Sequence, residues 1–129
     1  MKGKAFSSRG LKLDLEETPE ETVVRCRGKI TVRSAQMFQS EICGRVIPAS
    51  RGKGVATTCR IVLDLSQVTY VDSTGLGALF AVWKAGQSRS CEVEIINLGR
   101  RAEMLASVTR LDHAFSRIRG LFSSAERSA

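Results

Sequence analysis

The chain has 129 residues, of which 43% are hydrophobic and 26% charged, and a formal net charge of +7. These values fit one globular domain with its own apolar core. No run approaches the roughly 18 consecutive apolar residues that a membrane-spanning helix needs, and the N-terminal residues lack the apolar stretch of a secretory signal. We therefore expect a cytoplasmic protein with no transmembrane segment.

The excess of positive charge is concentrated in one part of the chain. Residues 25–60 carry eight basic side chains and one acidic side chain, whereas residues 1–24 and 61–99 are slightly acidic. A solvated face with a basic loop over residues 44–60 explains this more simply than a patch for nucleic acid or an anionic membrane. Because the basic residues are not interleaved with aromatic ones, a base-stacking surface is disfavoured. We expect no direct contact with nucleic acid.

The four cysteines and the single histidine, His113, do not form the close pairs typical of zinc ligands. We expect neither a metal site nor another cofactor. Cys26 and Cys91 lie inside strand-like runs, and free cysteine is among the most frequently buried residue types. Both are therefore predicted to be buried thiols.

The N-terminal part is predicted to form a tail and then a hairpin. Residues 1–9 are small and polar and are expected to be a flexible tail. Leucines at positions 11, 13 and 15 alternate with charged residues, which is the period of a half-buried strand, and residues 22–28 predict a second strand. The short break between them contains Pro19 and favours an antiparallel hairpin.

A helix and a loop are predicted next. Ser34 is suited to cap a helix, and apolar residues at helical spacing continue to about residue 47, where Pro48 is expected to end the helix. Residues 49–58 are rich in glycine and basic residues and are predicted to be a mobile loop. Helix and loop together favour a crossover to a parallel strand over another hairpin.

The centre of the chain has the pattern of a strand, a turn and a helix. Residues 61–65 are apolar on both faces, as in a central strand covered on both sides. A second apolar run covers residues 68–71 after a polar break. The following helix is predicted to bury one stripe of apolar residues at helical spacing: Leu76, Leu79, Phe80 and Trp83.

The remaining elements complete one predicted domain. The helix is expected to end over residues 86–90, followed by a strand at 91–98 and a short helix at 102–108. The alternation of strands and helices predicts an α/β fold with a mostly parallel sheet. We predict a single domain over residues 10–122 and a helical turn or tail at 123–129.

The turn between the central strand and its helix reads Asp72-Ser73-Thr74-Gly75-Leu76-Gly77. The oxygens of such short side chains accept hydrogen bonds from the free N–H groups of a helix start, and Ser73 has this capping role in the simplest interpretation. The two glycines indicate that a neighbouring helix or a partner approaches the backbone closely. The same helix start would also favour a phosphate on Ser73 or Thr74. A capped helix and a phosphorylated switch both fit these residues.

The same residues argue against catalysis. Hydrolase nucleophiles also lie at strand-to-helix turns, but the G-x-S-x-G pattern is absent, and His113 lies forty residues after Ser73. No G-x-x-x-x-G-K-[ST] loop for nucleotide phosphates occurs. We expect no catalytic residue and no enzymatic activity.

Residues 61–80, IVLDLSQVTYVDSTGLGALF, resemble the STAS domain family and, within it, the bacterial anti-sigma factor antagonists. The stretch Gly28-Lys29-Ile30 and residues 94–115 support the resemblance, which covers about residues 10–122. It implies the STAS fold, a four- to five-stranded mixed β-sheet with helices mainly on one side.

The resemblance also implies a function by partner switching. The unphosphorylated antagonist binds an anti-sigma factor, a serine kinase with the histidine-kinase-like ATPase fold, and so releases a sigma factor. The kinase phosphorylates the serine that matches Ser73, with Thr74 as the alternative, and a serine phosphatase reverses the reaction. We expect a monomer or weak dimer. The expected partner-binding residues are Thr31, Asp72, Ser73, Thr74, Gly75, Leu76 and Gly77.

Two features depart from the family pattern. Members that are kinase substrates commonly have acidic residues where this chain has Lys29 and Thr31, which bears on how well a kinase uses Ser73. The basic loop 44–60 is longer than usual. The alternative functions are a STAS subunit of a membrane lipid-transport ABC system that docks on its ATPase, and a nonphosphorylated scaffold of a signalling complex.

Overall fold

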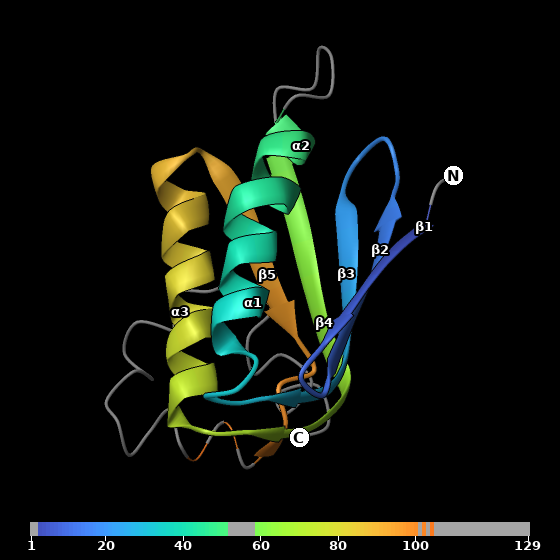
Figure 1. The fold of residues 1–129 in the computed structure, drawn as a ribbon. Coiled ribbons are helices and arrows are strands. Elements are labelled where there is room, and N and C mark those ends of the chain that lie inside the picture. Colours follow the sequence, from blue (N-terminus) through green and yellow to red (C-terminus); the bar gives the residue numbers. More distant parts are fainter. Residues whose placement is uncertain (1–2, 52–58, 101, 103, 105–129) are drawn as a thin grey trace, which may run out of the picture.

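The computed structural model describes residues 3–51, 59–100, 102 and 104. Its strands form one mixed sheet in the order β1-β2-β3-β4-β5 (Figure 1). β1 pairs antiparallel with β2, and β2 with β3, whereas β3, β4 and β5 run parallel. The strands are β1 (Gly3–Ser8), β2 (Leu11–Glu17), β3 (Thr22–Ile30), β4 (Cys59–Val71) and β5 (Cys91–Ile96).

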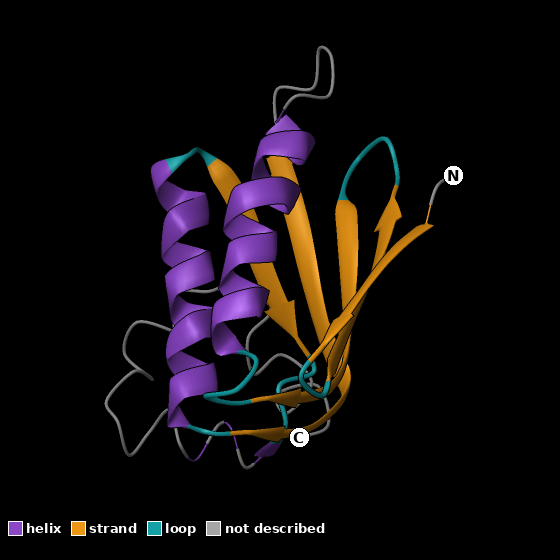
Figure 2. Cartoon of the chain, viewed as in Figure 1, coloured by secondary structure: helices purple, strands orange, loops and turns teal. Residues whose placement is uncertain are grey.

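The helices described in this paragraph cover one face of this sheet (Figure 2). Between β3 and β4 the chain forms α1 (Ala35–Glu41), the π-helical η1 (Ile42–Val46) and α2 (Ile47–Arg51). Between β4 and β5 it forms α3 (Ser73–Ser88), which lies beside α1. Each parallel connection therefore contains a helical crossover, as parallel strands require. The predicted α/β fold, a mixed sheet with helices mainly on one side, is confirmed.

The core lies between the sheet and these helices. The three leucines of β2 are buried, which confirms the period-two prediction for that strand. β4 lies between β3 and β5, and both Val62 and its neighbours Ile61 and Leu63 are buried. The prediction of a central strand is confirmed, and the polar break after Leu65 does not interrupt β4, which continues to Val71.

α3 buries a different stripe from the predicted one. Leu76 and Leu79 are buried as expected, but Phe80 and Trp83 are only partly buried and contact each other with ring centroids 5.7 Å apart. The remaining buried positions hold small or β-branched residues, which let the helix approach the sheet closely. The buried residues of α3 are Gly75, Leu76, Ala78, Leu79, Val82 and Gly86.

The N-terminal segment is not an unstructured tail in the structure. Gly3–Ser8 forms β1 and pairs along its whole length with β2. Its one large apolar residue, Phe6, packs against the core, and the Arg45 guanidinium lies 5.5 Å from the centre of its ring. The prediction failed because backbone pairing with an open strand edge needs no alternating apolar pattern.

The connection after β3 differs from the prediction at both ends. Ser34 precedes α1, but its side chain makes no capping hydrogen bond to the helix. Pro48 does not end the helical segment, which continues as α2. A proline ring clashes with the carbonyl four residues earlier in a regular α-helix, but here the wider π-helical turn ends at Val46 and Pro48 is the second residue of α2.

The predicted thiol at Cys91 is instead part of a disulfide. Cys59 and Cys91 are paired in the parallel register of β4 and β5, with their Cα atoms 4.5 Å apart. Cys26 is a buried free thiol, as predicted. Sequence spacing alone does not show which strands become neighbours, and the disulfide depends on that neighbourhood.

Several predictions lie outside the described residues. They concern the loop segment 52–58, most of the helix at 102–108, the region around His113 and the C-terminal segment 123–129. Within the described residues the predicted strand at 91–98 is present but ends at Ile96.

Candidate functional site

Asp72 connects the end of β4 to the start of α3 and to the turn after β3. It is the N-cap residue of α3, and its Oδ1 accepts a hydrogen bond from the Gly75 N–H at 2.7 Å. Its Oδ2 accepts a second hydrogen bond, from the Val32 N–H at 3.0 Å. One carboxylate therefore caps the helix and holds the turn against it.

Gly75 lies where α3 touches β3. A Cβ atom at this position would be 1.9 Å from the carbonyl oxygen of Ile30, so only glycine fits. The N–H of Asp72 also donates to that carbonyl, at 3.3 Å. At Gly77 a Cβ atom would meet nothing within 4 Å. The close approach to the backbone is therefore confirmed at Gly75, where the neighbour is a strand, and at Gly77 it stays a prediction that only a partner can fulfil.

Ser73 and Thr74 are both exposed in the first turn of α3. Because Asp72 supplies the cap, the interpretation of Ser73 as the capping residue is wrong. The hydroxyl of Ser73 projects from a helix start whose position is set by Asp72 on one side and by Gly75 on the other. Such a hydroxyl is accessible to a second protein without any rearrangement of the helix.

The other predicted partner-binding residues divide into two groups. Thr31, Asp72 and Gly77 are partly exposed and flank the two hydroxyls. Gly75 and Leu76 are buried, and Leu76 is 0% exposed. These two residues fix the helix on the sheet, so any effect they have on binding acts through the position of Ser73.

The turn after β3 lies directly against the junction. Thr31 Oγ1 accepts a hydrogen bond from the Arg33 N–H at 3.3 Å. Ser34 Oγ accepts from the Thr31 N–H at 3.1 Å and donates to the Lys29 carbonyl at 2.8 Å. Sequence reasoning missed Val32, whose N–H reaches Asp72 and whose side chain is exposed. The sequence feature that could have identified this residue is a β-branched apolar side chain inside an otherwise polar turn.

An open groove of about 770 Å³ runs between α1, η1 and α3 and begins beside Thr74. It is lined by small and polar side chains from both helical segments. The lining residues are Val32, Ala35, Gln36, Gln39, Ser40, Cys43, Thr74, Gly77 and Ala78. A partner that contacts Thr74 would therefore find a concave surface next to it.

The titratable groups near the helices are not set up for nucleophilic chemistry. Burial raises the pKa of the Cys43 thiol in the groove, although the nearby charge of Arg89 acts in the opposite direction. Burial also raises the pKa of Cys26. Since the thiolate is the reactive form of cysteine, neither thiol is activated.

Asp64, in the middle of β4, is the described carboxylate with a lowered pKa. Burial raises the pKa of Asp64, but hydrogen bonds from Asn97 Nδ2 at 3.0 Å and the Ser66 N–H at 2.9 Å outweigh it. Among the described residues no three metal-ligating side chains cluster.

No described helix combines the length and the apolar character that crossing a bilayer requires.

The fold is similar to that of several solved proteins. An anti-sigma factor antagonist from Mycobacterium paratuberculosis matches at 24% identity, over 91% of this chain and 92% of that one, with a TM-score of 0.59. The anti-sigma factor antagonist SpoIIAA in its unphosphorylated form matches at 17% identity, over 72% and 79% of the two chains, with a TM-score of 0.54. The murine anion transporter Slc26a9 matches at 17% identity, over 81% of this chain and 16% of the transporter, with a TM-score of 0.55.

At these identities the likeness shows the fold alone, and the fold occurs both in small regulators and within a transporter. A stronger result comes from the sequence, because the family model of the STAS domain matches residues 12–127. This match extends over nearly all of the chain and includes the junction at Asp72 and Ser73. The chain belongs to the STAS domain family.

Proposed function

We propose that this protein is a cytoplasmic anti-sigma factor antagonist. It binds an anti-sigma factor of the serine-kinase class, with a histidine-kinase-like ATPase fold, and thereby releases a sigma factor. Phosphorylation of Ser73 ends the complex, and a serine phosphatase restores binding. Membership of the STAS family and the likeness to anti-sigma factor antagonists support this function.

The observation that supports the proposal most directly is that one residue caps α3 and a different residue exposes its hydroxyl at the helix start. Asp72 accepts the capping hydrogen bond from Gly75, so the fold does not need the hydroxyl of the exposed Ser73. A side chain that is exposed and free of a structural role can be modified without unfolding the domain. Thr74 is also exposed and is the second candidate for modification.

A phosphate on Ser73 would meet two opposing effects within the folded chain. The free N–H groups and the dipole of α3 would stabilise it by about 0.3–1 kcal/mol. The neighbouring carboxylate of Asp72 would repel it, since phosphoserine adds nearly two negative charges. At an interface that buries a neutral Ser73 the added charge has no such compensation. The fold therefore survives modification while the complex dissociates.

Thr31 is the position at which the kinase reaction is expected to be limited. It lies in the turn that Asp72 holds against the helix start, and family members that are substrates commonly have an aspartate there. Thr31→Asp preserves an oxygen that can accept from the Arg33 N–H and should raise the rate of Ser73 phosphorylation. An unchanged phosphorylation rate would show that Thr31 does not limit the reaction.

The test is incubation of the purified chain with the candidate anti-sigma kinase and ATP, followed by localisation of phosphate by mass spectrometry. We expect one phosphate on Ser73, and none in Ser73→Ala. Ser88→Ala is the matched control, because Ser88 is an exposed serine at the other end of the same helix. A stable complex with an ATPase and no phosphate on any residue would instead support one of the two alternatives, the transport subunit or the scaffold.

A further inference from the structure

We propose that the surface around the junction, which we call the junction-end surface, receives an acidic protein segment that also carries apolar side chains. This inference rests on the proposed function and specifies the chemistry of the anti-sigma partner. Its centre is apolar and its rim is cationic. The central residues are Val32, Tyr70 and Met104, and the rim residues are Arg9, Lys29, Arg33 and Arg100.

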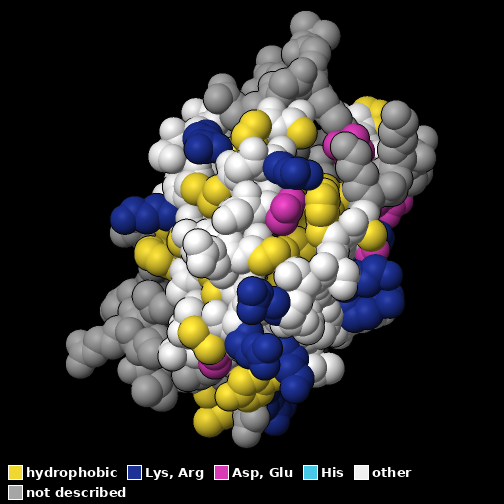
Figure 3. Space-filling view, viewed as in Figure 1, with side chains coloured by type: hydrophobic (Ala, Val, Ile, Leu, Met, Phe, Trp, Pro, Cys, Tyr) yellow, Lys and Arg dark blue, Asp and Glu magenta, His cyan; other side chains and the backbone are white. Residues whose placement is uncertain are grey.

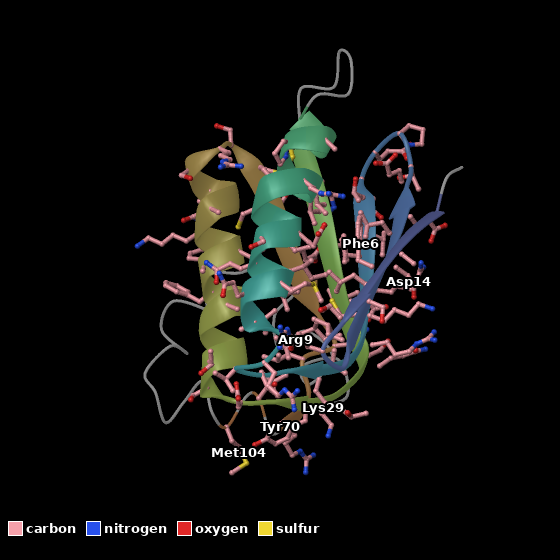
Figure 4. All side chains as sticks on the ribbon, viewed as in Figure 1. Phe6, Arg9, Asp14, Lys29, Tyr70 and Met104 are labelled. Carbon is pink, nitrogen blue, oxygen red and sulfur yellow. A yellow bond between two sulfur atoms is a disulfide. The ribbon has the colours of Figure 1, made fainter. Side chains whose placement is uncertain are left out.

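The backbone places these residues at one end of the molecule. The Lys29 N–H donates to the Gly10 carbonyl at 3.0 Å, which brings the turn after β1 against the end of β3. Lys29 is also the register partner of Tyr70 in β4. Figure 4 shows Lys29, Tyr70 and Met104 together at the lower end of the molecule, with Arg9 just above them.

Two further contacts complete this end. Val32 is tied to Asp72 by the 3.0 Å hydrogen bond to its carboxylate, so it lies next to the start of α3. Tyr70 lines a small cavity together with Gly99 and Ala102, which brings the segment that contains Arg100 and Met104 to the same place. The junction-end surface is therefore continuous with Ser73.

The apolar centre is unusually exposed. Val32 is 68% exposed, Met104 63% and Tyr70 41%, and these are the exposed large hydrophobic residues of the described chain. All three belong to one surface, and the rest of the described surface has no such residue. Clustered apolar exposure of this kind marks an interaction site rather than ordinary surface variation. The view in Figure 3 shows apolar and basic side chains mixed at this end.

The rim cations have no ion-pair partner within the described residues, in contrast to Arg25 and Arg60 elsewhere on the sheet. Arg25 pairs with Glu16 at 2.6 Å. Arg60, near the opposite end of the sheet, pairs with Glu21 at 3.1 Å, with Glu92 at 3.2 Å and also with Glu94. Among the described residues, the carboxylate of Asp72 beside Val32 accepts hydrogen bonds from two backbone N–H groups. Within the described part of the chain, the positive charge of the rim is therefore available to a partner.

An acidic protein segment fits this arrangement better than other anionic partners. An apolar centre inside a charged rim is the usual anatomy of a protein–protein interface. Single-stranded nucleic acid is bound by several stacked aromatic side chains along a basic groove, whereas this surface contains one aromatic residue. Complementary charge would speed association and fix the orientation of the partner.

The cationic rim also strengthens the switch at Ser73. A phosphate there would attract the same arginine and lysine side chains that the acidic segment uses, and it would repel that segment directly. Modification therefore removes the attraction and adds a repulsion at once. This differs from a surface without basic residues, on which a phosphate would act by desolvation and bulk alone.

The test measures the affinity of the purified chain for the kinase that phosphorylates Ser73, as a function of salt concentration and of charge. We expect Lys29→Glu with Arg33→Glu to weaken binding about 30-fold and to flatten its dependence on salt. Val32→Ala should weaken binding about tenfold through lost apolar contact. Lys84→Glu, an exposed lysine on α3 away from this surface, makes one such charge reversal, half the change of the double variant, and should bind like the wild type.

The outcomes separate this inference from the proposed function. If the double variant keeps a normal circular dichroism spectrum and thermal unfolding midpoint and binds as tightly as the wild type, while Ser73→Asp still weakens binding, the junction-end surface is not the docking site although the switch holds. If the kinase neither binds nor modifies the chain, both proposals fail. If the double variant loses retention on duplex DNA or on phosphatidylglycerol vesicles but not on the kinase, the surface serves those partners and the inference is wrong.

Discussion

The two ends of α3 are fixed to the sheet in the same way but present different surfaces. At the N-terminal end Gly75 lies against the Ile30 carbonyl of β3. At the C-terminal end a Cβ on Gly86 would be 2.5 Å from Val93 Cγ2 and 2.8 Å from the Cys91 carbonyl oxygen of β5. A glycine at each end thus lets the helix touch the backbone or side chains of a neighbouring strand.

The difference lies in what surrounds each contact. The C-terminal end is closed by the Cys59–Cys91 disulfide and by Arg89, whose guanidinium donates to the Cys43 carbonyl at 2.7 Å. The N-terminal end exposes Ser73 and Thr74, near rim cations that have no ion-pair partner in the part of the chain that the structure describes. The cross-link lies at one end of α3 and the exposed hydroxyls at the other. Because Asp72 supplies the cap, a change of charge at Ser73 need not disturb the fold.

The largest effect is expected from the glycine beneath the junction. Gly75→Ala places a methyl group on the Ile30 carbonyl and should cost about 4 kcal/mol or more in the free energy of unfolding. Gly77→Ala, two residues along the same helix, meets open space and should raise stability by up to about 1 kcal/mol through helix propensity. Urea unfolding of both variants measures this difference, and equal effects would contradict the close contact at Gly75.

The second largest loss of stability is expected from breaking the disulfide near the C-terminal end of α3. The cross-link spans 32 residues, a loop length for which its loss should cost about 3.7 kcal/mol. Cys91→Ser and the reduced wild type should both unfold at lower urea concentration than the oxidised protein. Cys43→Ser controls for the loss of a thiol. An identical midpoint for oxidised and reduced protein would show that the disulfide does not contribute.

Removing the N-cap of α3 should lower the free energy of unfolding to a smaller extent. Asp72→Ala loses the hydrogen bonds to Gly75 and Val32 and should cost about 2 kcal/mol. Asp72→Asn keeps one accepting oxygen and should recover roughly half of that loss. Hydrogen exchange of the Val32 and Gly75 amides reports the same contacts directly. Unchanged protection in Asp72→Ala would mean that the carboxylate does not hold the turn.

The smallest effect on stability is expected from a change that affects Asp64 in β4, the strand before α3. The pKa of Asp64 is lower in the folded chain than its ordinary value, so its ionised form stabilises the fold at neutral pH. This contribution is lost as the pH falls through the folded pKa. Asn97→Ala removes one hydrogen bond to Asp64, raises that pKa and should reduce the acid-induced loss of stability by less than about 1 kcal/mol. An identical pH dependence in both proteins would exclude this contribution.

The comparison of the two ends also shows which features the sequence made predictable. The junction could be predicted from the sequence because its sequence features are local: an apolar strand, a capping aspartate and glycine within four residues of one another. The predicted order of β2, β3, β4, α3 and β5 is confirmed for the same reason. The assignment of the cap to Ser73 failed by one residue, since aspartate and serine have equal capping chemistry and only the backbone decides between them.

The features that were missed depend on contacts between distant parts of the chain. β1 exists because β2 offers an open edge, and the disulfide exists because β4 and β5 become neighbours. The helix continues through Pro48 because a π-helical turn precedes it. The junction-end surface combines residues from four separate segments, and only two of its four cations, Lys29 and Arg33, belong to the basic stretch 25–60.

The central claim, that the charge at Ser73 controls binding, is tested most directly by calorimetric titration of the purified anti-sigma kinase into Ser73→Ala, Ser73→Asp and the wild type. We expect Ser73→Ala to bind like the wild type and Ser73→Asp to bind at least about tenfold more weakly, because a carboxylate at this site mimics part of the phosphate charge. Equal affinity of all three proteins for a kinase that they bind would contradict a switch at this residue.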